Sequence, residues 1–291
     1  MNYRSILVHL DESEPARTRL DVALHVAKRH GAHLSALFAP AVPEHDAAYA
    51  FILDAEYWSQ CHREHETCRR ALEHHFFSRL AEMELKGTWR TAAHAQHELL
   101  ARARFADLIV LGQSNPADVD ASLSNRFQAR VVLSAGRPVL FVPFVPPVSS
   151  PASGGFAHVG DHVMVAWDAG QSATRALHDA LPFMRLARQT ELVTFTPTHQ
   201  DGALAHQNED RIPAADIGLV LARHGLHVQV TELHPPPTVP VGDALLARAA
   251  KTGCDLVVMG AYGHARWKEL ILGGVTQTVL GAMQVPVLMS H

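Results

Sequence analysis

The chain has 291 residues, which is enough for two domains of about 140–150 residues each. Hydrophobic residues make up 47% of it and charged residues 19%, so each half can bury a core of its own. The formal net charge of −4 argues against a nucleic-acid partner, because proteins that bind nucleic acid usually carry a basic surface.

Neither the N-terminal residues nor the cysteines suggest export. Residues 1–8 run directly into a strand-like segment, without the basic region, apolar stretch and cleavage site of a signal peptide. No apolar run reaches the length needed to cross a bilayer. The cysteines Cys61, Cys68 and Cys254 are too few and too unevenly spaced for a disulfide framework. We therefore expect a cytoplasmic protein with no membrane partner.

The sequence contains an internal repeat. Residues 6–40 match residues 163–197 without a gap, at an offset of 157 (163 minus 6). Residues 107–138 match residues 255–286 without a gap, at an offset of 148 (255 minus 107). Two matching blocks in the same order indicate a duplicated domain.

The repeat sets the expected domain boundaries. We expect one domain over residues 1–145 and a second over residues 161–291. The segment 146–160 is rich in Pro, Ser and Gly, and we expect it to be a linker.

Each copy is predicted to alternate strands with helices. Short apolar strands that alternate with helices indicate a parallel sheet covered on both faces. In the second copy the expected elements are, in chain order, a strand over 162–167, a helix through Ala173–Met184, a strand over 190–195, a helix over 212–224, a strand over 226–232, a helix over 243–252, a buried strand over 255–259, a helix from about residue 274 and a strand over 286–289.

A glycine-rich loop follows the fourth predicted strand of the second copy. Gly260 and Gly263 are followed, nine residues later, by Gly273 and Gly274. Glycines let backbone amides approach an anion with no Cβ in the way, and a helix that begins near Gly274 would direct its free N–H groups at a phosphate. Thr276 would add a hydroxyl donor. The same glycines would also suit a simple chain turn and the close packing of helix on sheet, so both interpretations stay open.

This spacing resembles the C-terminal signature of the universal stress protein (UspA-like) family, whose ATP-binding members carry Gly-x2-Gly-x9-Gly-(Ser/Thr). The strand-plus-Asp segments that end at Asp11 and Asp168 resemble the family's N-terminal block, so the resemblance covers nearly all of the chain, twice. It implies two tandem open parallel five-stranded sheets in the order 3-2-1-4-5, with helices on both faces. Asp168 and Gly260 would then face one crevice.

The resemblance also implies a ligand, which is ATP or another adenine nucleotide, with or without Mg²⁺. Residues after the first and second strands would hold base and ribose, and the glycine loop would hold the phosphates. Asp168 would contact the ribose or base, or it would cap the helix that follows. Carried over by position, the expected binding residues are Ala166, Trp167, Asp168, Phe195, Thr196, Met259, Gly260, Tyr262, Gly263, Gly273, Gly274, Val275 and Thr276.

One position of the second loop departs from the family's pattern. Gly274 stands where the pattern has Ser or Thr, which removes one hydroxyl hydrogen bond. Such a bond contributes about 0.5–1.5 kcal/mol, or up to about tenfold in affinity.

The first copy has lost most of the loop. Among the glycines that the sequence match assigns to it, only Gly112 remains, and side chains stand where amides would have to approach a phosphate. We expect this copy to be a degenerate, structural half, and the chain to bind at most one nucleotide. The residues at the positions equivalent to 263, 273, 274 and 276 are Asn115, Asn125, Arg126 and Gln128.

A second cluster has metal-binding character. Cys61, His65 and Cys68 share one face of a predicted helix, and such soft ligands suit zinc. Trp58, Leu72 and Phe76 continue the same stripe, however, as in the core face of an amphipathic helix. We expect no metal there.

The resulting functional hypothesis is a stress-response regulator or sensor with a nucleotide in its second domain and at most weak ATPase activity. No catalytic residue is assigned, because no positioned base or metal ligand is evident. The alternatives are a slow ATPase or nucleotide hydrolase, and a nucleotide-free interaction scaffold. The resemblance further implies that the last strands, Pro138–Val142 and Pro286–Met289, pair within one chain, and it leaves homodimer formation open.

Overall fold

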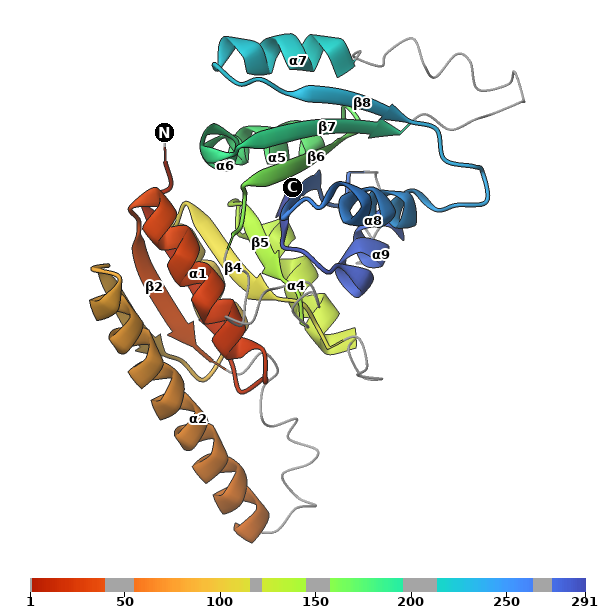
Figure 1. Ribbon diagram of the computed structural model, residues 1–291. Coiled ribbons are helices and arrows are strands. Elements are labelled where there is room, and N and C mark those ends of the chain that lie inside the picture. The colour runs from red at the N-terminus through yellow and green to blue at the C-terminus, as the bar shows by residue number, and fades with distance from the viewer. Residues whose placement is uncertain (1, 40–54, 116–121, 145–157, 196–213, 264–273) are drawn as a thin grey trace. The chain divides into compact units, whose positions relative to one another are not determined.

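The computed structural model describes residues 2–39, 55–115, 122–144, 158–195, 214–263 and 274–291. These residues form two compact units, one from residues 2–137 and one from residues 138–144 together with 158–291 (Figure 1). Most of the expected linker lies outside the described residues, so the domain boundaries stay a prediction.

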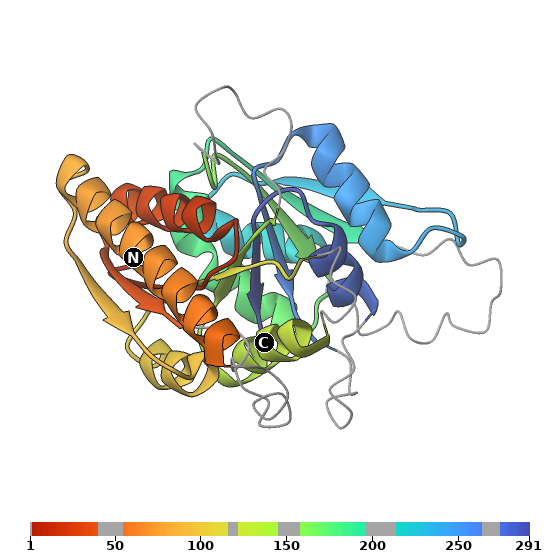
Figure 2. The ribbon, with the colours of Figure 1, turned by 90° about the horizontal axis from the view of Figure 1, so that it is seen from below.

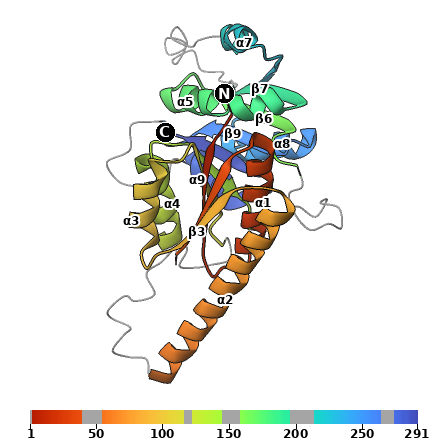
Figure 3. The ribbon, with the colours of Figure 1, turned by 90° about the vertical axis from the view of Figure 1, so that its left-hand side faces the viewer.

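The first unit consists, in chain order, of β1 (Ser5–Leu10), α1 (Ala16–His30), β2 (His33–Phe38), α2 (Ala55–Glu82), β3 (Gly87–Thr91), α3 (Ala95–Ala103), β4 (Leu108–Gly112) and α4 (Ser122–Ser134). Its strands run parallel in the order β3-β2-β1-β4. α1 and α2 lie side by side over one face of this sheet (Figures 1 and 2). α3 and α4 cover the other face (Figure 3).

The second unit consists of β5 (Val139–Val142), β6 (His162–Trp167), α5 (Gln171–Asp179), α6 (Leu181–Leu186), β7 (Gln189–Phe195), α7 (Ala214–Arg223), β8 (Gln229–Leu233), α8 (Val241–Thr252), β9 (Leu256–Gly260), α9 (Gly274–Ala282) and β10 (Val287–Ser290). Its strand order is β5-β10-β9-β6-β7-β8. α5 packs on β9 and β10, and α8 packs against α9; α5 and α8 lie on opposite faces of the sheet (Figure 3).

The expected order 3-2-1-4-5 is confirmed in both copies, as β3-β2-β1-β4-β5 and as β8-β7-β6-β9-β10. The central strands are apolar and buried on both faces, as a parallel sheet between helix layers requires. The predicted elements of the second copy are present with small shifts. β8 begins at Gln229 rather than at residue 226, and α8 begins at Val241 rather than at residue 243.

The last strands of the two copies pair within the chain, as expected. β5 and β10 run antiparallel, with Phe141 opposite Val287 and Val139 opposite Met289. Each strand thereby satisfies an edge of backbone N–H and C=O groups that would otherwise be open to pairing with another chain.

The residue correspondence between the two copies shifts by one residue at their second strands, β2 and β7. Ser5 lies opposite His33 in the first copy, whereas His162 lies opposite Gln189 in the second. β2 and β7 therefore correspond at an offset of 156 (189 minus 33), so the ungapped offset of 157 is wrong beyond the first helix. The physical reason is a helix break, because α1 is one continuous helix and the equivalent segment divides into α5 and α6 around Ala180.

Only α2, with 28 residues, has the length of a membrane-spanning helix within the described parts of the chain. Its charged residues are too many for that role, and none of the described helices is both long and apolar enough to cross a membrane.

Candidate functional site

The candidate site of the second unit lies where three elements meet. β6 and β9 are parallel neighbours, so Asp168, just after β6, and Gly260, at the end of β9, lie at the same edge of the sheet. α5 begins at Gln171, close behind Asp168. Open α/β sheets bind their ligands at this edge, beyond the carboxyl ends of the strands.

Gly260 is required by packing. A Cβ at this position would lie 2.5 Å from the Ala173 nitrogen and 2.6 Å from the Ser172 carbonyl carbon. Both are backbone atoms of α5, which cannot move aside without shifting the helix. The lack of a side chain at Gly260 thus lets the first turn of α5 close onto the end of β9.

Gly263 has different surroundings. A Cβ there would lie 2.7 Å from Ser172 Oγ and 4.0 Å from Asp168 Oδ2, while Gly263 itself is exposed. A side chain at Gly263 would therefore push the loop away from Ser172. Gly263, Ser172 and Asp168 come together at one point, from three different elements.

Asp168 does not cap α5. The N-cap residue is Gly170, which makes no side-chain cap hydrogen bond, and Asp168 Oδ1 accepts a hydrogen bond from the Gly170 N–H at 2.8 Å. Asp168 thus stabilises the turn before the helix, in which Ala169 has a φ of +61°. Its carboxylate is exposed, with Oδ2 on the Gly263 side.

α9 is described from Gly274 onward, and the residues directly before it lie outside the described part of the chain. Gly274 is exposed, and a Cβ there would meet no atom of the described residues within 4 Å. Val275 is also exposed, whereas Thr276 is 4% exposed. If the helix begins at Gly274, its first amides have no acceptor within the helix, which is the arrangement that an anion site uses. Gly273 lies outside the described residues.

The remaining expected residues line the strand ends. Met259 is buried, and Ala166 and Phe195 are half-buried. Trp167 is 5% exposed, and its Nε1 has no hydrogen-bond partner among the described residues. Thr196 lies outside the described residues.

Tyr262 contributes its backbone to the loop, while its ring lies elsewhere. It has a φ of +58°, and its ring packs edge-on against His291, with the ring centroids 6.4 Å apart. Burial raises the pKa of the Tyr262 hydroxyl, which has no hydrogen-bond partner within the described residues.

In the first unit, buried side chains fill the equivalent place. Asp11, the counterpart of Asp168, is ion-paired with Arg19 Nη2 at 2.7 Å. A Cβ at Gly112, the counterpart of Gly260, would lie 2.2 Å from Arg19 Nη1. Gln128 Nε2 donates a hydrogen bond to the Gly112 carbonyl oxygen at 2.7 Å. Whether this copy has lost the ability to bind a nucleotide stays a prediction.

Two buried titratable groups adjoin this network. Burial alone would raise the pKa of Asp11, but Arg19, His9 and a hydrogen bond from Ser13 outweigh it and hold that pKa at about 2. His9 is buried, and burial lowers its pKa to about 4, although its ring also bonds the Ala39 carbonyl oxygen at 2.8 Å.

Sequence reasoning missed both Arg19 and Ser172. Arg19 occupies a position of α1 that the helical period assigns to the core, between the buried Ala16 and Ala23. The sequence signal that could have revealed the ion pair is an arginine on the core face of the helix, eight residues after Asp11. Nothing in the sequence distinguishes Ser172 from a surface serine.

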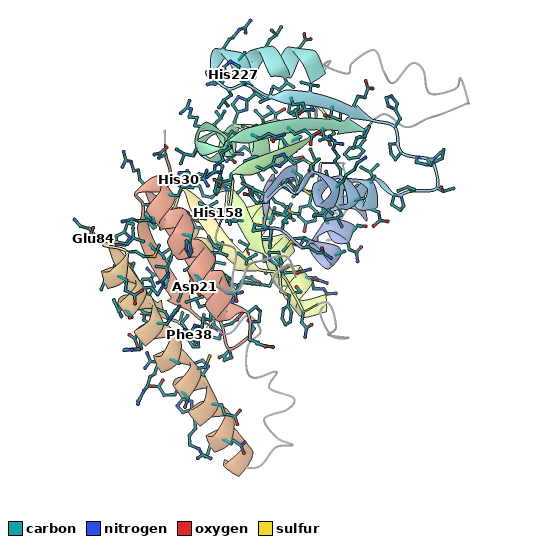
Figure 4. The ribbon with its side chains drawn as sticks, in the orientation of Figure 1. Asp21, His30, Phe38, Glu84, His158 and His227 are labelled. Atoms are coloured by element: carbon teal, nitrogen blue, oxygen red, sulfur yellow. The ribbon has the colours of Figure 1, made fainter. Side chains whose placement is uncertain are left out.

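His65 and Cys68 of α2 are half-buried, and Leu72 and Phe76 further along the same stripe are buried. His65 contacts the Glu12 carboxylate and packs edge-on against Phe38, with the ring centroids 5.1 Å apart. Phe38 lies at the end of β2 (Figure 4). Burial, followed by the charges of Glu12 and Asp11, raises the pKa of Cys68. The side chain of Cys61 is outside the described set, so the absence of a metal there stays a prediction.

Comparisons with known proteins bear on the whole chain. A family model for the universal stress protein family matches residues 2–143 and 160–291. A universal stress protein from Archaeoglobus fulgidus has a similar fold, with a TM-score of 0.70 and 18% identity over 98% of this chain and 95% of that chain. A functionally unknown protein from Pseudomonas aeruginosa is similar over 99% of this chain and 92% of its own, with a TM-score of 0.56 and 17% identity.

A universal stress protein in complex with cAMP matches 50% of this chain and 100% of its own, with a TM-score of 0.34 and 19% identity. At these identities the likeness concerns the fold. A comparison with curated proteins gave no match.

Proposed function

The chain belongs to the universal stress protein family, and we propose that it is a cytoplasmic stress-response regulator or sensor whose second repeat binds an adenine nucleotide. The observation that carries this proposal is the meeting of Gly263, Ser172 and the exposed Asp168 carboxylate at the ends of two neighbouring parallel strands. A crevice beyond the carboxyl ends of parallel strands is the usual ligand site of such sheets.

In this proposal the phosphates lie against Gly263 and the first turn of α9, where the helix presents unpaired amides and the positive end of its dipole. The ribose and base lie against the ends of β6, β7 and β9, within reach of Asp168 and Trp167. The exposed carboxylate of Asp168 is also an oxygen ligand of the kind that Mg²⁺ takes, so Mg²⁺ could accompany the nucleotide without any change in the protein.

Little hydrolysis follows from this arrangement. Helix amides stabilise bound phosphate in the ground state as well as in the transition state, and such uniform binding does not raise turnover. One observation favours the rival hypothesis of a slow ATPase, namely that the Asp168 carboxylate lies beside Gly263, where it would serve as a base. Steady turnover of about one per second or faster, lost in Gly263→Val, would establish the rival.

We predict one ATP per chain, and its loss in Gly263→Val. A β-branched side chain at Gly263 would collide with Ser172 Oγ, 2.7 Å from the Cβ position, and displace the loop. We expect the affinity measured by calorimetric titration to fall at least about tenfold, equivalent to about 1.4 kcal/mol. Gly281→Val is the matched control, because a Cβ at Gly281 in α9 meets no atom within 4 Å. Two equivalent sites per chain, or unchanged affinity in folded Gly263→Val, would contradict the proposal.

Gly274→Ser is expected to strengthen nucleotide binding. The described part of α9 has room for the side chain at Gly274, since a Cβ there meets no atom of the described residues within 4 Å. The added hydroxyl would donate one more hydrogen bond to phosphate, worth about 0.5–1.5 kcal/mol, or roughly two- to tenfold in affinity. The same titration measures it, with Gly274→Ala as the control that lacks the hydroxyl. Equal affinities for the Ser and Ala variants would place the phosphate away from this helix.

A further inference from the structure

Arg19 is a buried cation on the core face of α1. It is 4% exposed, and the neighbouring residues of its stripe, Ala16 and Ala23, are 1% and 0% exposed. Arginine is seldom buried to this extent, because removing its charge from water is unfavourable unless partners take up the charge and the N–H groups. The position therefore calls for a specific partner.

The partner is the strand-end network of the first repeat. Arg19 Nη2 donates to Asp11 Oδ1 at 2.7 Å, and Nη1 lies 2.2 Å from the Cβ position of Gly112. Gly112 must lack a side chain because the guanidinium takes its place. Gln128 completes the network through its 2.7 Å hydrogen bond to the Gly112 carbonyl oxygen. The guanidinium thus lies at the carboxyl ends of β1 and β4, the edge at which this fold holds ligands.

The second repeat is built differently at the equivalent positions. Ala176 replaces Arg19, and the α5 backbone closes onto Gly260, with the Ala173 nitrogen 2.5 Å from the Cβ position. At Gly112, by contrast, the three nearest heavy atoms all belong to Arg19. In the first repeat, the guanidinium of Arg19 therefore fills the space between α1 and the end of β4. In the second repeat, the backbone of α5 itself closes the equivalent space at the end of β9. The carboxylate that it binds in the first repeat is exposed in the second.

We propose that Arg19 is an internal occupant of the strand-end crevice in the first repeat, which makes that crevice a site for a guanidinium cation rather than for a phosphate. The occupant supplies from within the chain the charge that Asp11 requires, so the repeat keeps its shape without a ligand. The inference rests on the proposed function only in taking this edge of the sheet to be a ligand site.

The test is chemical rescue of Arg19→Ala in the full chain. The substitution leaves a cavity beside an unpaired carboxylate, and we expect the thermal midpoint of the affected transition to fall by about 10 °C. Methylguanidinium at millimolar concentration should raise that midpoint in a saturable way, as a ligand of the folded state does. Methylammonium should raise it less, and inorganic phosphate should not raise it. Arg17→Ala, an exposed arginine of the same helix, should show neither the loss nor the rescue.

A second variant identifies the carboxylate as the recognising group. In Asp11→Asn/Arg19→Ala the cavity remains but its charge is gone, so the preference for methylguanidinium over methylammonium should disappear. If Arg19→Ala does not fold unaided, the readout is the yield of folded protein after refolding with each cation, and methylguanidinium should give the higher yield. Equal effects of the two cations on Arg19→Ala would overturn the proposal. No step involves a nucleotide, so this result and the nucleotide titration can fail independently.

Discussion

Replacing Asp11 by alanine is expected to lower the free energy of unfolding by about 3–5 kcal/mol, because it leaves the buried guanidinium of Arg19 without its counterion. The equivalent change in the second repeat, Asp168→Ala, should cost less than about 1.5 kcal/mol without nucleotide. Asp168 is exposed and accepts one hydrogen bond from the Gly170 N–H, so water replaces the lost contact.

The duplicated chain supplies the matched control for this prediction. Urea unfolding gives the loss of stability, and hydrogen exchange read by mass spectrometry assigns it to peptides of α1 and β1 or of α5 and β6. Asp11→Asn should fall between wild type and Asp11→Ala, since the amide oxygen still accepts from Arg19. Similar losses for the two aspartates would mean that the Arg19 ion pair adds nothing beyond the turn that each aspartate stabilises.

In nucleotide titrations, Asp168→Ala is expected to have the larger effect of the two variants, in contrast to its smaller effect on stability. Asp168→Ala removes a carboxylate beside Gly263 and should weaken nucleotide binding, whereas Asp11→Ala should leave the affinity unchanged while the second unit stays folded. One position would then affect stability and its counterpart affect binding. This is the outcome that a single functional site in a duplicated fold requires.

The alternation of strands and helices was predictable from the sequence, because two local patterns of apolar residues indicate it. Fully apolar runs such as Leu256–Gly260 indicate strands buried on both faces, and the stripe Ala173–Leu177 indicates a helix that packs on them. The strand order came from the family resemblance. The shift of one residue between β2 and β7 was not predictable, because the break after α5 leaves the sequence match ungapped.

The candidate site was predictable only in part. The glycine spacing predicted a binding role for both Gly260 and Gly263, but it could not distinguish a packing role from a binding role. The surroundings of each Cβ position do so, because Gly260 meets the α5 backbone whereas Gly263 meets the side chains of Ser172 and Asp168. The functional assignment of Gly263 stays a prediction, and the packing role of Gly260 is a finding.

Buried charges were the features that sequence reasoning could not foresee. Arg19 and Glu191 both occupy positions that periodicity assigns to the core, and both are buried. Glu191 is 1% exposed on β7, where it accepts hydrogen bonds from Arg248 and from Thr231, the latter at 2.6 Å. Each partner lies on a different element, so the pair becomes visible only once the chain is folded.

Acid is expected to destabilise the first unit well before the second. His9 and His30 are both buried there, and burial lowers the pKa of each to about 4 from an ordinary value of 6.5. Between pH 6.5 and pH 4 the unfolded chain therefore binds more protons than the folded one, so stability falls as the pH falls. The loss is about 1.4 kcal/mol per pH unit for each histidine, or about 2 kcal/mol each between pH 6.5 and pH 5.

We expect the described part of the second unit to lose less stability in the same window. Ala166 stands at the position of His9, and burial raises the pKa of Asp255, which makes acid favour the folded state at that residue. Burial would raise the pKa of Glu191 as well, but Arg248 and Thr231 outweigh it and lower that pKa. Stability that depends on Glu191 is therefore lost only below the ordinary pKa of a glutamate, near 4.3.

The measurement is urea unfolding at pH 7 and pH 5, with hydrogen exchange to assign each transition to a unit. His9→Gln is the decisive variant, because an amide can still donate to the Ala39 carbonyl oxygen, 2.8 Å from the histidine ring, but does not titrate. It should reduce the stability lost by the first unit between the two pH values by about half, or about 2 kcal/mol. An unchanged loss in His9→Gln, or an equal loss in the second unit, would show that His9 is not the group whose protonation opens the first repeat.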